Sequence, residues 1–176
     1  MSTTKWILDP THSELGFAIK HLMISNVKGN FTKFDAVIEG KDFSTSSAHV
    51  TIDVNSISTN NADRDAHLKA PDFFDAENNS KITFTGTSLT KISNEEYTLN
   101  GTLTIKGISK EVALNVEFGG ANKDPWGNEK IAFSIHGKIN RNDFGLTWNA
   151  ALETGGVLVS EEVKINAEVQ FVKQVS

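Results

Sequence analysis

The amino-acid sequence predicts an all-β protein, an eight-stranded antiparallel β-barrel with one or two short helices in the connection after the third strand. Three observations predict this fold class. Apolar and polar residues alternate with a period of two in most of the chain, helical spacing is nearly absent, and most connections are too short for a crossover helix. Eight strands with one apolar face each bury those faces best by closing into a barrel, and a two-sheet sandwich is the structural alternative.

The alternating segments follow one another along the chain. In the first of them, Leu15, Phe17 and Ile19 alternate with polar neighbours such as Glu14 and Lys20. The predicted strands cover residues 14–20, 33–39, 50–54, 82–84, 99–106, 112–118, 130–139 and 163–171. The connections ISNEEYT and KGISKE suit hairpins, and GGANKDPWGNE carries the glycine, asparagine and Asp-Pro residues of a longer turn. We therefore expect antiparallel neighbours.

One segment, STNNADRDAHLKAPDFFD at 58–75, breaks the alternation. Asn60, Asn61 or Asp63 can cap the start of a helix there, and Pro71 ends it. The segment therefore predicts a short helix at one end of the barrel. The two phenylalanines that follow it either plug that end as core or line an opening into the interior.

Length and composition predict one domain over residues 1–176. The formal charge of -5, with scattered Lys and Arg, disfavours a nucleic-acid partner. The absence of cysteine excludes disulfides and thiolate chemistry. No apolar run approaches the roughly 20 residues of a membrane-spanning helix. Because no signal peptide is present in the sequence as written, a cytoplasmic location is expected, or a periplasmic one if a signal was removed.

The candidate reactive side chains do not form a recognisable catalytic or metal motif. His21 shares the phase of Phe17 and Ile19 and is expected to point inward, whereas His49 and His136 fall on polar faces. There is no HExxH or His-x-His pair and no Gly-x-Ser-x-Gly elbow, so we expect neither a metal site nor a catalytic nucleophile.

Two polar groups are candidates for contact with a ligand. Arg64 and Asp65 form either an ordinary surface pair or, with His67 and His21 at a barrel mouth, a site for the polar head of an apolar ligand. INRNDFGLTWNA offers a similar mixture of Arg141 with aromatic residues, and it is either a second such site or a strand end with a covering loop.

Several motifs occur together in an order and spacing that resemble one family. They are DPTHSELGFAIKHL, VKGNF, SISTNNADRDAHLKAPDFFD, KITF, GTLTIKGISKEVAL, INRNDFGL and SEEVKINAEVQ. From about Trp6 to Val172 the chain resembles the YceI-like family of polyisoprenoid-binding or lipid-binding domains. The resemblance implies an extended, lipocalin-like barrel around an elongated apolar tunnel, a non-catalytic role, and a prenyl quinone, polyprenyl phosphate or related long-chain amphiphile as ligand, with no cofactor. A homodimer is also expected from it.

The ligand-binding residues expected on this basis form a wall and a mouth. The wall is predicted to comprise Phe17, Ile19, Phe34, Ile52, Val54, Phe84, Leu99, Leu103, Leu114, Val116, Phe133, Ile135 and Ile165. The mouth and head-group site are predicted to comprise His21, Arg64, His67, Leu68, Phe73, Phe74, Arg141, Phe144 and Trp148. The alternatives are a filled barrel that acts as an interaction or stress-response protein, and a lipid-modifying enzyme that uses His21.

Overall fold

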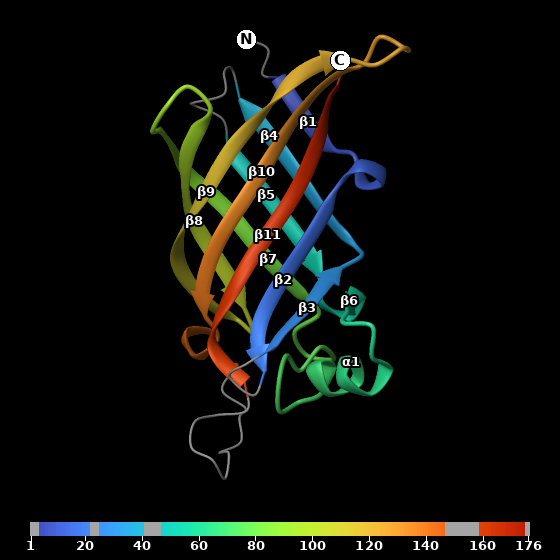
Figure 1. Ribbon diagram of the computed structural model, residues 1–176, viewed down its shortest axis with the longest axis vertical. Helices are drawn as coiled ribbons and strands as arrows, with labels where there is room; N and C mark the ends of the chain where they lie inside the picture. Colours follow the sequence, from blue (N-terminus) through green and yellow to red (C-terminus); the bar gives the residue numbers. More distant parts are fainter. Residues whose placement is uncertain (1–3, 22–24, 41–46, 147–158, 175–176) are drawn as a thin grey trace.

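The computed structural model describes residues 4–21, 25–40, 47–146 and 159–174, which form one closed, strongly tilted β-barrel (Figure 1). Its short helices are α1 (Ala62–Lys69) and the 3-10 turns η1 (Pro10–His12), η3 (Val54–Ser56) and η4 (Arg141–Phe144). Its strands are β1 (Thr4–Leu8), β2 (Glu14–His21), β3 (Ser25–Phe31), β4 (Phe34–Gly40), β5 (Ser47–Asp53), β6 (Ile57–Ser58), β7 (Lys81–Lys91), β8 (Glu96–Ile105), β9 (Ile108–Lys123), β10 (Glu129–Asn140) and β11 (Val159–Gln174).

These 11 strands occupy eight positions around the barrel. β1 and β2 lie one after the other along β11, because β1 pairs with its C-terminal part and β2 with the part before it. In the next position around the barrel, β4 pairs with β1 and β3 pairs with β2, so β4 and β3 also lie end to end. In the third position, β5 pairs with β4 and β6 pairs with β3. The single strands β7 to β11 complete the ring, which the antiparallel pairing of β1 with β11 closes. The predicted eight-stranded antiparallel barrel is therefore confirmed.

The strand prediction missed β1, β3 and β6. In β1 the apolar Ile7 is exposed, so apolar residues occur on both faces and hide the alternation. In β3 the position between the inward-facing Val27 and Phe31 is Gly29, which carries no apolar side chain and reads as a turn residue. β6 has only two residues, too few for any periodic pattern.

The predicted helix is confirmed as α1. Asn61 is its N-cap and accepts a hydrogen bond from the backbone N–H of Arg64 at 3.0 Å, while Asp63 and Asp65 lie in the first turn. Both features stabilise a helix N-terminus, through the free N–H groups and through the helix dipole. The helix ends at Lys69, before Pro71, which cannot continue it.

α1 and the residues after it lie where the strand pairing of the barrel is interrupted. β7 pairs with β5 only down to Lys81 and Asp53, and β6 pairs with β3. In Figure 1, α1 lies beside β6 at the end of the barrel opposite the two termini. The chain from α1 to β7 therefore closes this end with side chains in place of a strand ladder.

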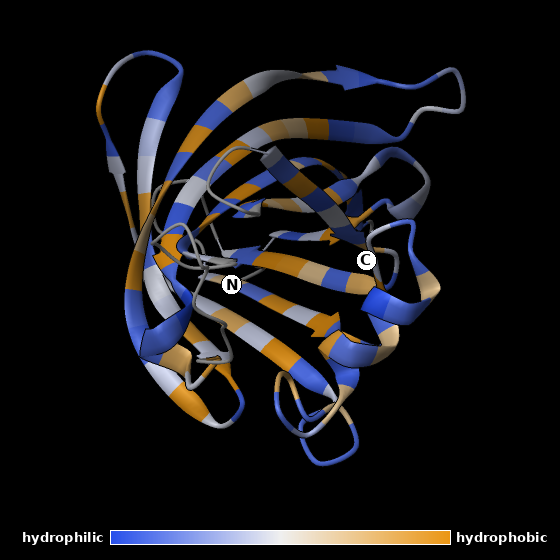
Figure 2. Cartoon of the chain, turned by 60° about the horizontal axis from the view of Figure 1, so that its bottom comes forward, coloured by the Kyte–Doolittle hydropathy of each residue, from blue (hydrophilic) through white to orange (hydrophobic). Residues whose placement is uncertain are grey.

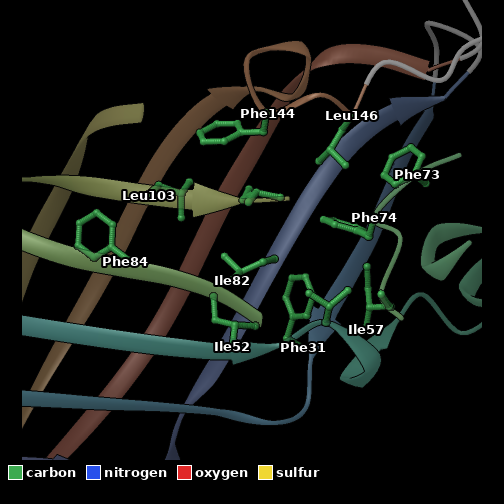
Figure 3. Close-up of a cluster of buried hydrophobic side chains, with 13 residues drawn as sticks. Phe31, Ile52, Ile57, Phe73, Phe74, Ile82, Phe84, Leu103, Phe144 and Leu146 are labelled. Atoms are coloured by element: carbon green, nitrogen blue, oxygen red, sulfur yellow. The ribbon is translucent and has the colours of Figure 1, made fainter. Parts of the chain in front are cut away.

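The barrel interior contains two packed apolar clusters. The α1-end cluster, shown in Figure 3, includes Phe31, Ile52, Val54, Ile57, Phe73, Phe74, Ala76, Ile82, Phe84, Leu103, Ile105, Phe144 and Leu146. The far-end cluster includes Leu8, Ala36, Val116, Ile131, Phe133, Ala167, Val169 and Phe171. Figure 2 shows hydrophobic and hydrophilic residues alternating along the strands, which is the pattern that separates this interior from the outer surface. Within the described ranges, no helix has the length and apolar character needed to cross a bilayer.

Candidate functional site

A cavity of about 410 Å³ extends through the barrel interior and takes its lining from both apolar clusters. Its volume lies within the range of roughly 300–1,000 Å³ that is usual for small-molecule sites. The lining comes from inward-facing side chains of strands on every side of the barrel and from the segment around α1. The barrel is therefore hollow, which argues against the filled-barrel alternative.

Most of the predicted site residues line this cavity. The wall residues that do so are Phe17, Ile19, Phe34, Ile52, Phe84, Leu99, Leu103, Leu114, Val116, Phe133, Ile135 and Ile165. The predicted mouth residues that do so are Arg64, His67, Leu68, Phe73, Phe74 and Arg141. Period-two alternation located the wall because successive side chains of a strand point to opposite faces of the sheet.

Two predicted residues are placed differently. Val54 and Phe144 are each only 1% exposed, but they pack inside the α1-end cluster and are not among the cavity-lining residues. Val54 lies in η3, just past the end of β5, where the backbone turns and strand alternation no longer sets its direction. Phe144 lies in η4, just past the end of β10, where strand alternation likewise no longer sets the direction of the side chain. The side chain of His21 and the whole of Trp148 lie outside the described residues.

The prediction missed the lining residues that come from the unrecognised strands β3 and β6 and from the residue after β6. These are Val27, Phe31, Ile57 and Thr59. The sequence VKGNF does contain a signal for the first two, because Val27, Gly29 and Phe31 are spaced by two residues. No local pattern identifies Thr59, since its position depends on where α1 packs.

The polar side chains in the described lining all lie at the α1 end. They are Thr59, Arg64 and His67, which belong to α1 or precede it closely, and Arg141 of η4. The rest of the described lining is apolar apart from Gly16. The site therefore has a long apolar body with positive charge at one end.

Thr59 connects α1 to the cavity wall. Arg64 donates from Nε to the Thr59 hydroxyl at 2.8 Å and from a terminal guanidinium nitrogen to the Thr59 carbonyl at 2.7 Å. Asp65 accepts from the Thr59 backbone N–H at 2.9 Å and also from its hydroxyl. Among the described residues, Arg64 and Asp65 form no direct ion pair, so the surface-pair interpretation is wrong. Both side chains instead hold one threonine that is 5% exposed.

Arg141 places a buried positive charge beside the cavity. It is 1% exposed, and its guanidinium donates to the backbone carbonyls of Ser160 at 2.8 Å and Leu146 at 2.6 Å. Burial lowers the pKa of Arg141 and the carboxylate of Glu161 partly offsets this, but an arginine so far above neutrality remains charged. These two backbone carbonyls hold the guanidinium at the cavity wall.

His67 and the two phenylalanines form the part of the lining that closes the α1 end. His67 Nε2 lies 3.0 Å from Asp72 Oδ2, and the His67 ring lies edge-on to Phe73 with 6.4 Å between ring centroids. The ring centroids of Phe73 and Phe74 are 5.3 Å apart, those of Phe74 and Phe31 are 6.5 Å apart, and both pairs are edge-on. Figure 3 shows Phe73 and Phe74 between the strands and α1. Edge-on aromatic pairs of this kind hold rings in defined positions.

A second polar cluster with unusual electrostatics lies outside the cavity. Burial raises the pKa of Asp9, but hydrogen bonds from Thr11, His12 and Lys130 outweigh it and hold this pKa well below the ordinary range. Asp9 Oδ2 and the Thr11 hydroxyl both contact His12 Nδ1, at 2.9 and 3.1 Å, so the imidazole cannot relay a proton between them. The cluster caps η1 between β1 and β2 and is structural. No group of metal-binding side chains occurs within the described ranges.

Comparison with known proteins fits this geometry. The YceI-like domain family matches residues 6–171, nearly the full chain. The chain belongs to the YceI-like family. A UPF0312 protein of Staphylococcus aureus (strain N315) is 46% identical to this YceI-like chain over 171 residues, which cover 96% of the chain and 97% of that relative.

Two solved structures have folds similar to that of this YceI-like chain. The crystal structure of a Campylobacter jejuni YCEI protein superposes with a TM-score of 0.76 at 42% identity, covering 89% of this chain and 90% of that one. A polyisoprenoid binding domain from Saccharophagus degradans, implicated in plant cell wall breakdown, has a TM-score of 0.68 at 18% identity, covering 96% and 98%. At that identity the second likeness concerns the fold alone.

Proposed function

We propose that this protein is a non-catalytic carrier that binds, stores or transports a long-chain isoprenoid lipid of the prenyl quinone or polyprenyl phosphate type, or a similar amphiphile. The observation that carries the proposal is the asymmetry of the cavity, which is apolar along its length and polar only at the α1 end. An amphiphile with one polar head and one long tail has the same asymmetry.

The apolar body supplies enough free energy for such a ligand. Each buried methylene-sized group contributes about 0.8 kcal/mol, so a tail that buries about a dozen of them gains on the order of 10 kcal/mol before the costs of association. No reactive side chain is required for this kind of binding. The neutral aliphatic and aromatic wall provides affinity, and the polar end provides orientation.

The polar end gives the ligand a direction. We expect the head group beside Arg64, His67 and Arg141, and the end of the tail near the far-end cluster, for example at Phe133 and Phe171. Arginine side chains beside the cavity favour an acceptor-rich or anionic head, since a charge-assisted hydrogen bond is stronger than a neutral one.

The comparisons support a lipid ligand at the level of the family. The Saccharophagus degradans domain that shares the fold is described as polyisoprenoid binding. We do not favour a lipid-modifying enzyme, because the described residues form no metal site and the His67–Asp72 pair is solvent-accessible, with 38% and 54% of the two side chains exposed. The homodimer and the cellular compartment stay predictions, which sedimentation analysis and cell fractionation check.

Native mass spectrometry of the protein purified from its own organism tests the proposal, followed by solvent extraction and identification of any released lipid. A stoichiometric prenyl quinone or polyprenyl lipid is the expected result. Delipidated protein is then titrated with the same lipid alongside Ala167→Phe, which fills the cavity, and Ala113→Phe, on the exposed face of β9, as matched control. An empty protein that also fails to take up such lipids in vitro would overturn the proposal.

A further inference from the structure

Gly29 lies on the inner face of β3, directly opposite Phe17 of β2, where the polar end of the cavity meets its apolar body. A Cβ at this position would lie 2.5 Å from Cζ and 2.9 Å from Cε1 of Phe17, and 2.9 Å from Cγ2 of Thr59. Both of these side chains line the cavity. The ring of Phe17 and the methyl of Thr59 therefore occupy the space that a side chain at position 29 would fill.

Two other inward-facing glycines also lie close to a side chain of the cavity wall, but each has a further explanation. A Cβ at Gly101 would meet Cζ of Phe84 and the backbone oxygen of Thr85, each at 2.5 Å, so the backbone of the neighbouring strand by itself requires a glycine there. A Cβ at Gly137 would meet the tip of Leu114, which can rotate. The close contacts of Gly29 are all with side chains of the cavity wall.

The two neighbours of Gly29 differ in their freedom to move. Thr59 is held by Arg64 and Asp65 through its hydroxyl and its backbone. The ring of Phe17 has no polar anchor and contacts Phe31 at a centroid distance of 5.7 Å. A methyl group at position 29 would therefore displace the Phe17 ring away from β3, and the space on that side of the ring is the cavity.

We propose that Gly29 is a specificity-determining residue that keeps this junction wide enough for a methyl-branched chain. The inference rests on the proposed function, because it concerns the shape of the chain that the same cavity takes. An isoprenoid chain carries methyl branches at regular intervals and is thicker than a linear alkyl chain. With the Phe17 ring in the space that a side chain at position 29 would fill, the branched chain passes from the polar end into the apolar body.

Two alcohols test the effect of chain thickness while the chain length and the head group stay constant. Phytol and hexadecanol have the same head and the same main-chain length, and only phytol carries methyl branches. Their affinities are measured by displacement of a fluorescent lipid probe from delipidated protein. In Gly29→Ala we expect the phytol affinity to fall about tenfold or more, and the hexadecanol affinity to change by less than about threefold.

A matched control and a rescue variant accompany this measurement. Gly119→Ala places a methyl 3.4 to 3.6 Å from Ala132, outside the cavity lining, and is expected to leave both affinities unchanged. Gly29→Ala combined with Phe17→Leu removes the bulk that the methyl displaces, and is expected to restore phytol binding. If Gly29→Ala does not fold, Phe17→Trp narrows the same junction from the opposite strand and is expected to show the same selective loss.

The outcomes are distinguishable. Wild-type protein that binds neither alcohol nor any prenyl lipid overturns the proposed function and this inference with it. Wild-type protein that binds both alcohols, with equal losses or no loss in the narrowed variants, overturns the role of Gly29 alone.

Discussion

The guanidinium of Arg64 and the buried Thr59 are joined by two hydrogen bonds, from Nε to the hydroxyl at 2.8 Å and from a terminal nitrogen to the carbonyl at 2.7 Å. Asp65 accepts from the same threonine, so adjacent residues of opposite charge act on one neutral partner. This contact holds α1 against the barrel where no strand ladder closes it, and places the charge of Arg64 at the cavity.

Thr59→Val is expected to loosen α1 without unfolding the barrel. The substitution removes the hydroxyl but leaves Arg64 and Asp65 in place, and an unsatisfied partly buried polar group costs about 1–3 kcal/mol. Hydrogen exchange of the α1 amides should accelerate while that of the β9–β10 ladder stays slow. Thr85→Val on the exposed face of β7 serves as control. Unchanged exchange in α1 would show that Thr59 does not anchor the helix.

Phe73→Leu is expected to weaken lipid retention more than it lowers the melting temperature. Phe73 and Phe74 are each 8% exposed, line the cavity and belong to the α1-end cluster. Because Phe→Ala in a core costs about 3–5 kcal/mol, the double alanine variant would confound binding with folding, and a single leucine avoids this.

Val54→Ala is the matched control for Phe73→Leu. Val54 lies in the same cluster without lining the cavity, so its truncation should lower the melting temperature and leave lipid retention unchanged. If Phe73→Leu also affects the melting temperature alone, the segment is a core plug and does not gate the ligand.

Arg141→Gln is expected to change head-group preference. The loss of a buried charge-assisted interaction corresponds to about 1.5–3 kcal/mol, so affinity for a polyprenyl phosphate should fall by roughly ten- to a hundredfold. Affinity for the matching polyprenyl alcohol should change less, since a neutral head does not use the charge. Competition between the two lipids measures the difference directly, and equal losses would place the head group elsewhere.

The lowered pKa of Asp9 predicts that part of the free energy of unfolding is lost in acid. Its folded-state pKa lies below the ordinary value, so its contribution is present above the unfolded-state pKa of about 4 and is lost as the pH falls through the folded value. The melting temperature of the wild type should therefore drop between pH 5 and pH 2, at about 2–4 °C for each kcal/mol lost.

Asp9→Asn should melt lower than wild type at neutral pH and lose less on acidification. Asp35→Asn, on the exposed face of β4, is the control and should follow the wild type. Parallel acid profiles for wild type and Asp9→Asn would assign the acid sensitivity to other carboxylates.

Local sequence patterns were sufficient for most of the strands and for α1. Alternation identified the inner face of β10 through Phe133 and Ile135, because a strand sends successive side chains to opposite sides whatever it packs against. Pro71 and three candidate N-caps bounded α1, because capping and termination act within one turn, and the structure uses Asn61 as the cap. The same patterns failed at β3, where Gly29 interrupts the apolar phase, and at Val54 and Phe144, which follow the ends of strands.

The sequence by itself determined which side chains face inward, since that depends on a period of two along each strand. Only the tertiary structure decided that the interior is hollow, because a cavity depends on how side chains from many strands fill a common space. It also decided that Arg64 and Asp65 meet Thr59, and that Arg141 is brought to the same end of the cavity from a distant part of the chain. No periodic pattern in the sequence predicts these contacts, because they depend on how α1 and η4 pack against the barrel.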